Sequence, residues 1–171
     1  MRIICAALLS MASFSCLAQA PKSAPSFKME VNELAPDNQK INEAFEALKG
    51  KIPLPLDNGK IIVGINTPGI ELGAENHAKV HTVFEGEVTS VMQAEGKKIV
   101  IVRHGNYFTV YNKLDYVSVT KGQHVDAYAP LGTVADGDHQ KAALNFQLWK
   151  GSKNEATTKL DPKEWLIGLR K

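Results

Sequence analysis

The chain has 171 residues, 44% of them hydrophobic, and a formal charge of +2 at neutral pH. So small a charge argues against nucleic acid as a partner, because nucleic-acid-binding surfaces are strongly basic. The two cysteines, Cys5 and Cys16, lie near the start of the chain, so the remainder has no thiol for a disulfide, for nucleophilic catalysis or for a metal.

The first residues have the pattern of an export signal. Arg2 precedes a compact apolar run, Ile3 to Leu9, and small residues follow it. The small-x-small rule fits cleavage after Ala18 or after Ala20. We predict a signal peptide over residues 1–18, because cleavage after Ala20 would leave a proline next to the cut, where its fixed φ fits a protease cleft poorly.

Two other interpretations of this segment are less favoured. A membrane anchor would need a longer and less polar run to span about 30 Å of hydrocarbon. A lipid-modified Cys16 would need a different lead-in from the Ser13-Phe14-Ser15 that precedes it. We therefore expect an exported protein, in the periplasm or elsewhere in the cell envelope, with no transmembrane anchor after signal cleavage.

Residues 19–38 hold three prolines among small and polar residues, which predicts a flexible tether. Asp37 and Asn38 are N-cap candidates for a short helix, and we assign residues 39–52 to that helix and its lead-in. One face of the helix carries its apolar positions, Ile41, Phe45 and Leu48.

Residues 53–171 form one β domain in this prediction, because the hydrophobic period changes to two from Lys60 onward. The segments are short, rich in β-branched residues and separated by glycines. The fold class is all-β, a compact β-sandwich or barrel with a short N-terminal helix. The predicted strands are 60–63, 70–72, 79–84, 87–92, 98–104, 107–114, 116–119, 131–134 and 143–149, with a further short apolar segment at 165–166.

Both faces of the segment 99–102 are apolar, since all four residues are isoleucine or valine. A strand that is buried on both faces typically consists of such an unbroken apolar run. We therefore place this segment at the centre of the sheet.

Five segments in order resemble the lysostaphin/LytM family of peptidoglycan peptidases. They are 84–91 (FEGEVTSV), 99–114 (IVIVRHGNYFTVYNKL), 117–134 (VSVTKGQHV through PLGTV), 144–149 (LNFQLW) and 161–166 (DPKEWL). No single segment is specific, but their order and spacing follow the family pattern. The resemblance implies a LytM-like domain of the duplicated-hybrid-motif type, preceded by a lead-in similar to that of murein-hydrolase activators.

Enzymes of that family bind zinc through an H-x-x-x-D motif and the second histidine of an H-x-H motif, with two further histidines near the attacking water. The matching positions in this chain depart from the pattern. Thr67 and Glu71 stand in the first motif, Ala143 and Asn145 in the second, and Lys113 in place of a water-orienting histidine. Threonine and asparagine oxygens are weak zinc ligands, and a lysine repels the ion. We therefore expect no zinc, no catalytic residues and only vestigial metal positions at Thr67, Glu71 and Asn145.

The resemblance also implies a groove that could be used for binding. Degenerate members of the family often activate cell-wall amidases through it, so we expect a non-catalytic domain that binds peptidoglycan peptide or regulates a cell-wall hydrolase. The expected lining residues are Thr67, Glu71, Tyr111, Lys113, Ala143 and Asn145, with His104 nearby.

Two alternatives remain open. One is an active zinc endopeptidase with atypical ligands, in which His77 and His81 would contribute to a relocated site. The other is a biotinyl/lipoyl-like carrier, because residues 122–134 also resemble that β-sandwich, although Lys97 and Lys98 lack the flanking residues of a modified lysine.

Overall fold

The computed structural model describes residues 36–62, 69–137, 142–151 and 157–167. The predicted signal peptide and most of the predicted tether lie outside the described residues. The described part is mostly antiparallel β-sheet with one short α-helix, which confirms the all-β prediction. Its elements are α1 (Pro36–Ala47), β1 (Lys60–Ile62), β2 (Ile70–Ala74), β3 (Lys79–His81), β4 (Gly86–Ala94), β5 (Lys97–His104), β6 (Tyr107–Val117), β7 (His124–Val125), β8 (Pro130–Val134), β9 (Ala142–Lys150), β10 (Thr158–Leu160) and the 3₁₀ helix η2 (Pro162–Glu164).

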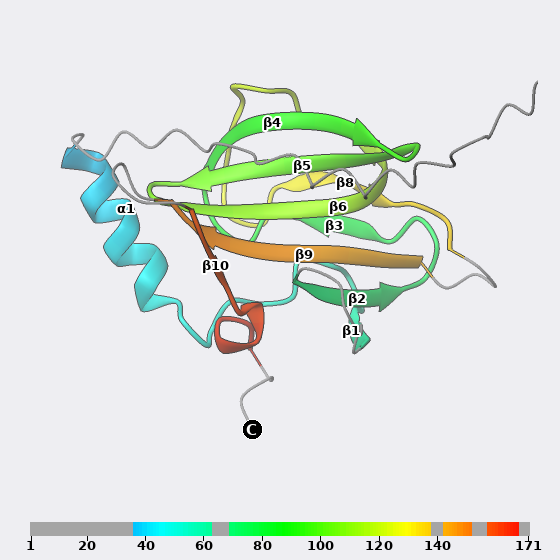
Figure 1. Cartoon of the computed structure of the whole chain (residues 1–171), viewed down its shortest axis with the longest axis horizontal. Coiled ribbons are helices and arrows are strands. Elements are labelled where there is room, and N and C mark those ends of the chain that lie inside the picture. Colours follow the sequence, from blue (N-terminus) through cyan, green and yellow to red (C-terminus); the bar gives the residue numbers. More distant parts are fainter. Residues whose placement is uncertain (1–35, 63–68, 138–141, 152–156, 168–171) are drawn as a thin grey trace, which may run out of the picture.

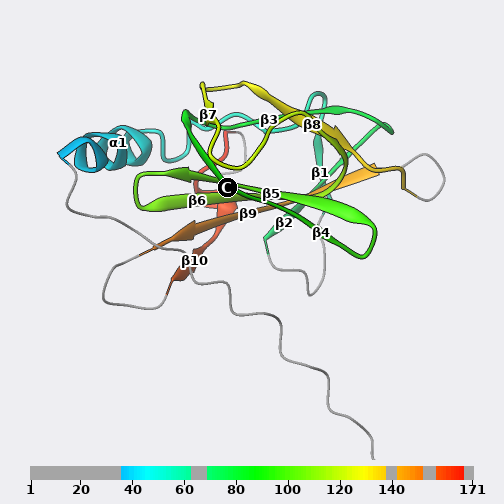
Figure 2. The same cartoon turned by 90° about the horizontal axis from the view of Figure 1, so that it is seen from above.

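The described strands belong to one sheet, whose main path has the order β1-β2-β9-β6-β5-β4-β7 (Figure 1). β10 pairs with β9, while β8 pairs with both β3 and the final residues of β6. The long β6 therefore belongs to both parts of the sheet, and the sheet folds back over itself. Figure 2 shows α1, β3, β7 and β8 together on one side of the long strands β5, β6 and β9.

The main core lies between the long strands and this second layer. Alternate residues of the long strands point into it, because side chains of a β-strand alternate between its faces. Its largest fully buried side chains include Tyr111, Phe146 and Leu131. We call the opposite face of the long strands the outer face.

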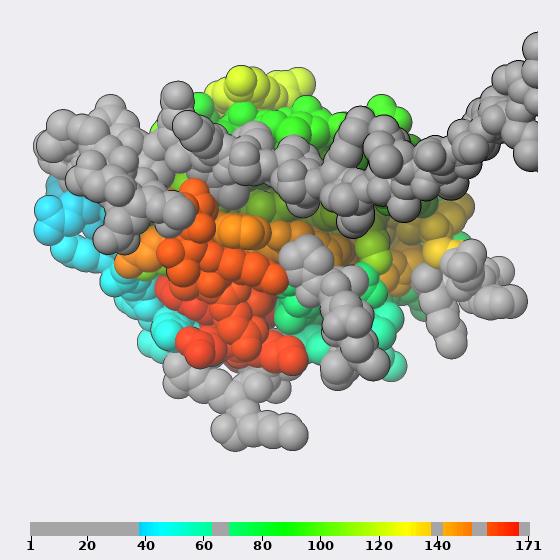
Figure 3. Space-filling model, viewed as in Figure 1, coloured from blue at the N-terminus to red at the C-terminus, as the bar shows by residue number. Residues whose placement is uncertain are grey.

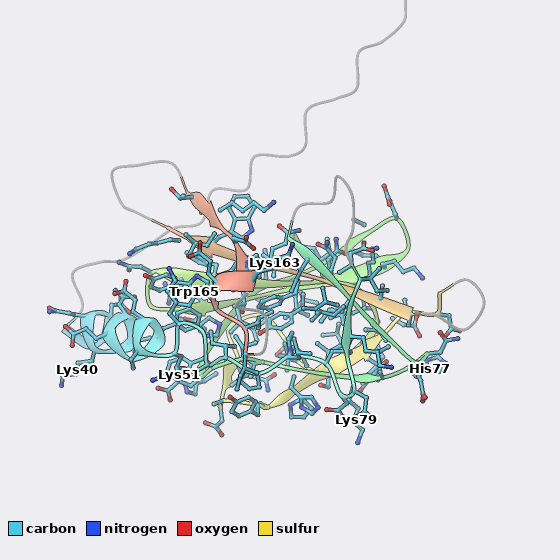
Figure 4. The ribbon with its side chains drawn as sticks, turned by 90° about the horizontal axis from the view of Figure 1, so that it is seen from below. Lys40, Lys51, His77, Lys79, Lys163 and Trp165 are labelled. Carbon is cyan, nitrogen blue, oxygen red and sulfur yellow. The ribbon has the colours of Figure 1, made fainter. Side chains whose placement is uncertain are left out.

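The helix α1 contributes to the same core. Phe45 is 0% exposed, and its ring centroid lies 4.9 Å from that of Tyr107, 5.1 Å from that of His104 and 5.4 Å from that of Trp165. Figure 4 shows Trp165 beside the end of α1. The C-terminal segment and the helix are thus held by one aromatic cluster at one end of the sheet.

The boundaries of several elements differ from the prediction. β3 ends at His81 instead of residue 84, and β2 and β4 each extend two residues beyond their predicted ends. The helix begins at Pro36, inside the range 19–38 assigned to the tether, and a proline is favourable in the first turn because it lacks the N–H that would stay unpaired there. Strands 107–114 and 116–119 form one continuous β6, with a register shift between Leu114 and Tyr116 instead of a break. The short strands β7 and β10 were not predicted.

No helix among the described residues is long and apolar enough to cross a membrane.

Candidate functional site

A row of polar residues crosses the outer face. In the strand register Glu71 of β2 pairs with Asn145 of β9, and Asn145 pairs with Asn112 of β6. Directly opposed residues of antiparallel strands project to the same face, so these three side chains are neighbours. Together with Lys113 we call them the polar row.

Lys113 reaches the row through an unusual backbone conformation. Its φ is +74°, a value that residues other than glycine rarely adopt, and it lies where the pairing of β6 becomes irregular. Its backbone N–H donates a hydrogen bond of 2.6 Å to Oδ1 of Asn112. Irregularities of this kind change the direction of a side chain and are frequent near functional sites. The result is that the Lys113 ammonium donates a charged hydrogen bond to the carboxylate of Glu71.

The Glu71–Lys113 pair is partly shielded from water. The Glu71 side chain is 16% exposed and that of Lys113 is 40% exposed. A hydrogen bond between charged groups in such a setting is stronger than one on an open surface. The carboxylate is thus already engaged by a cation of this chain.

A chain of side-chain hydrogen bonds orients Asn145. Trp149 Nε1 donates to Gln147 Oε1 at 3.1 Å, and Gln147 Nε2 donates to Asn145 Oδ1 at 2.8 Å. These residues alternate along β9 and therefore share the outer face. Asn145 itself is 3% exposed, and one lone pair of its amide oxygen accepts the hydrogen bond from Gln147.

Some of the residues expected in the groove lie together on the outer face, and others do not. Glu71, Lys113 and Asn145 come together, and Ala143 lies two residues before Asn145 on the same face, opposite Gly73. Thr67 lies outside the described residues.

Tyr111, expected in the groove, lies instead in the main core. Its hydroxyl accepts a hydrogen bond of 3.0 Å from the Val83 backbone N–H, and its ring packs against Phe146. Burial raises the pKa of Tyr111, so the phenol stays protonated. The alternation along β6 explains the correction, since Tyr111 and Asn112 must point to opposite faces.

His104, expected near the groove, is likewise a core residue. It is 0% exposed, with Nδ1 2.6 Å from the Glu85 carbonyl oxygen and Nε2 2.8 Å from Thr109 Oγ1. Burial lowers the pKa of His104 to about 4, because the charged ring would lose its hydration. A neutral, fully bonded imidazole in this position holds the core together and does not face a ligand.

The outer face also carries an apolar cluster that sequence reasoning did not assign to the site. Ile101, Phe108 and Val110 form a cluster separate from the main core, and Ile99 and Trp149 pack against it. We call these five residues the apolar strip. It adjoins the polar row, because Ile99 pairs with Asn112 in the register. The signal in the sequence was the segment 99–102, which is apolar on both faces.

The described residues do not fit a zinc centre. Catalytic zinc needs about three histidine, cysteine or carboxylate donors. In the part of the chain that the structure describes, no group of three or more such side chains is placed to hold a metal. The polar row supplies a single carboxylate, which an ammonium occupies, and a neutral amide.

The histidines considered for a relocated site bind different carboxylates. His77 Nε2 lies 3.3 Å from Asp136 Oδ1, and Figure 4 shows His77 at the end of the molecule opposite α1. His81 Nε2 lies 3.2 Å from Asp57 Oδ1, without the alignment of a hydrogen bond. Each is thus engaged in a local contact of its own.

An open pocket of about 330 Å³ lies beside the outer face, lined by Gly69, Ile70 and residues 159–163. Figure 3 shows β9 in orange and the C-terminal elements in red at the surface of the molecule. The pocket borders the end of β2 and does not include the polar row.

One of the comparisons with known proteins identifies a family. The model of "Peptidase family M23" matches residues 66–162, more than half of the chain. No curated protein matches the sequence.

Solved structures share the fold at low identity. A candidate M23 peptidase from Pseudomonas aeruginosa is 17% identical over 79% of this chain, with a TM-score of 0.56. The structure of the SpoIIQ–SpoIIIAH pore-forming complex contains a chain that is 18% identical over 70% of this one and covered to 92%, with a TM-score of 0.55. Lysostaphin, an antimicrobial peptidase from Staphylococcus simulans, is 20% identical over 62%, with a TM-score of 0.52. The present chain spans 62% of the Pseudomonas chain and 48% of lysostaphin.

Proposed function

The chain belongs to peptidase family M23, and from this premise we propose that it is a non-catalytic member, which binds peptidoglycan peptide or regulates a cell-wall hydrolase through its outer face. The proposal includes export to the periplasm or cell envelope. The observation that carries it is the ammonium of Lys113 on the carboxylate of Glu71.

The pair bears on catalysis through electrostatics. In the family pattern the Glu71 position supplies a negative ligand to zinc, whose charge acidifies the attacking water. Here the same carboxylate is neutralised by a lysine of the chain itself. A divalent cation at this point would have to displace the ammonium and would then meet its positive charge a few ångströms away.

The composition of the outer face bears on binding. A polar row with hydrogen-bonding amides lies against the apolar strip, of which Trp149 is partly exposed and Phe108 is buried. Recognition surfaces for proteins and peptides combine aromatic anchors with a few oriented polar groups. Membership in family M23 gives the carrier alternative no support.

The absence of catalysis is tested by restoring the family pattern. We expect the mature wild-type protein to contain less than about a tenth of an equivalent of zinc. A variant with Thr67→His, Glu71→Asp, Lys113→His and Asn145→His is expected to bind close to one equivalent. The matched control carries Thr67→His, Glu71→Asp and Asn145→His but keeps Lys113, and it should bind less zinc. Full zinc occupancy in the wild type would favour the atypical endopeptidase.

The binding function is tested with purified cell-wall amidases and with isolated peptidoglycan. We expect the wild-type protein to raise amidase activity or to bind peptidoglycan, and we expect Gln147→Arg, in the middle of the outer face, to lose either effect at least about tenfold. Tyr128→Ser is the control, since Tyr128 is 51% exposed and precedes β8 on the other side of the long strands. Unchanged amidase activity together with no retention on peptidoglycan would refute the proposal.

A further inference from the structure

Strand β4 lies at the border of the sheet and has a long free edge. It pairs with β5 along most of its length, whereas β7 pairs with it at Gly86 and Glu87 alone (Figure 1). From Ser90 to Ala94, no described residue pairs with β4 on the side away from β5. The other border strands β1, β7 and β10 have only two or three residues each. An unpaired edge of this length is a template for a further strand.

The register identifies the backbone groups on the free side. Both backbone groups of Val88 point away from β5, because they form hydrogen bonds of 2.9 and 2.7 Å with the loop before β7. Val88 pairs with Val102 and, beyond a bulge, Val91 pairs with Val100. Val102 and Val100 are two residues apart and therefore have the same orientation in the ladder. The N–H and C=O groups of Val91 and of Gln93 thus point to the free side.

The side chains of the free edge lack the usual protection against pairing. Edge strands commonly carry a charge or a proline, but Ser90–Ala94 has neither, whereas β1 and β10 each contain a lysine. Val91 and Met92 are each 36% exposed. Consecutive residues of a strand point to opposite faces, so an exposed apolar side chain lies at the edge on both faces. A strand that pairs here must be uncharged and apolar on both faces.

The edge of β4 itself meets this requirement. We propose that β4 pairs with β4 of a second copy of the chain, antiparallel and centred on Met92. In this register Val91 of each copy exchanges backbone hydrogen bonds with Gln93 of the other, and Ser90 lies opposite Ala94. Two identical uncharged segments bring no like charges together, so nothing in the pairing opposes it electrostatically.

The pairing joins two outer faces into one surface. Opposed residues of antiparallel strands share a face, so Met92 of one copy meets Met92 of the other on the outer side of a continuous sheet. In each copy Met92 pairs with Ile99, Ile99 with Asn112 and Asn112 with Asn145. The two Asn145 residues are then seven strand spacings apart, roughly 34 Å.

A dimer of this geometry would present two polar rows side by side to one ligand. That consequence rests on the proposed function, because a polymer with repeated peptides would be held at two positions at once. The pairing itself does not rest on it and is measured on the isolated protein.

Sedimentation of the mature protein from micromolar to millimolar concentration tests the dimer. The interface is small, so we expect a reversible monomer–dimer equilibrium. Val91→Lys should weaken dimerisation at least about tenfold, because each copy then brings a charge to the shared edge. The matched control is Ile62→Lys, the same kind of change on β1 at the opposite border, where the side chain is 44% exposed. It should leave the equilibrium unchanged.

Disulfide formation tests the register. The chain after the predicted signal peptide has no cysteine. At the centre of the pairing the two Cα atoms lie about 4.5 Å apart, within the range of a disulfide, so Met92→Cys should give a covalent dimer under mild oxidation. Ser90→Cys is the control on the same strand and face. Its two copies would lie about 14 Å apart and should stay unlinked.

Hydrogen exchange separates the occupants of the edge. We expect the amides of Val91 and Gln93 to exchange more slowly as protein concentration rises. Slow exchange at every concentration would mean that the same chain covers the edge, and fast exchange at every concentration would mean that no second copy binds. Either result, a monomer throughout sedimentation, a dimer equally tight with Val91→Lys, or equal linkage through Ser90→Cys would overturn the proposal. None of these results affects the tests with peptidoglycan and amidases.

Discussion

Replacing Lys113 by methionine tests the role of the Glu71–Lys113 pair in the fold. The change keeps the length of the side chain and removes the ammonium, so that the Glu71 carboxylate, 16% exposed, is left without its cation. Breaking a fully buried pair costs about 3–5 kcal/mol, whereas an exposed pair contributes about 0–1 kcal/mol. Since the Lys113 side chain is 40% exposed, we expect a loss of about 1–2 kcal/mol in the free energy of unfolding.

Urea unfolding measures this loss, and a double-mutant cycle assigns it to the pair. Glu71→Gln combined with Lys113→Met should recover most of the stability, because no unpaired charge remains. The control is Lys79→Met, the same chemical change at an exposed lysine of β3 that forms no ion pair with a described residue. A loss no larger for Lys113→Met than for Lys79→Met, or strictly additive effects in the cycle, would refute the account of the pair.

Three further predictions concern the core and can be measured by the same unfolding experiment. Burial lowers the pKa of His104 to about 4, so as the pH falls from about 6.5 toward 4 the unfolded state takes up a proton that the folded state does not. The free energy of unfolding should therefore decrease over that window, by up to about 3 kcal/mol, and His104→Phe should flatten the decrease. Gly69→Ala should lower the free energy of unfolding by roughly 2–3 kcal/mol, because φ is +90° and a Cβ would meet the Phe146 carbonyl oxygen. Gly96→Ala is the comparison: its φ is +75° but the space around it is open, so the loss should be about 1 kcal/mol. Phe45→Ala should cost about 3–5 kcal/mol, because it removes a ring at the centre of the aromatic cluster, and a loss below about 1 kcal/mol would mean that α1 folds apart from the sheet.

The sequence predicted the strands well where their composition is distinctive. β5 and β9 are long and rich in β-branched or alternating apolar residues, and each was predicted to within one residue at its ends. β7 has two residues and β10 has three, so no period can be read from them, and only their pairing with β4 and β9 makes them strands. β6 was divided at residue 115, because a bulge interrupts the alternation in the same way as a turn does.

The sequence predicted which positions belong to the candidate site, but not which of their side chains make contact. The family pattern brought Glu71, Lys113 and Asn145 into consideration, but whether their side chains meet depends on register, and a shift of one residue would send each to the other face. The contact of Lys113 with Glu71 depends further on a φ of +74° that no local sequence signal indicates. Tyr111 was misplaced for the same reason, since the motif identifies the strand but not the face.

Zinc content and muropeptide cleavage, measured together on the mature wild-type protein, test the central claim most directly. The protein is expected to retain less than about a tenth of an equivalent of zinc after dialysis against the metal, and to release no new fragments from purified peptidoglycan. One tightly bound zinc per chain, with fragments that disappear on chelation, would contradict the claim and make the chain a working peptidase.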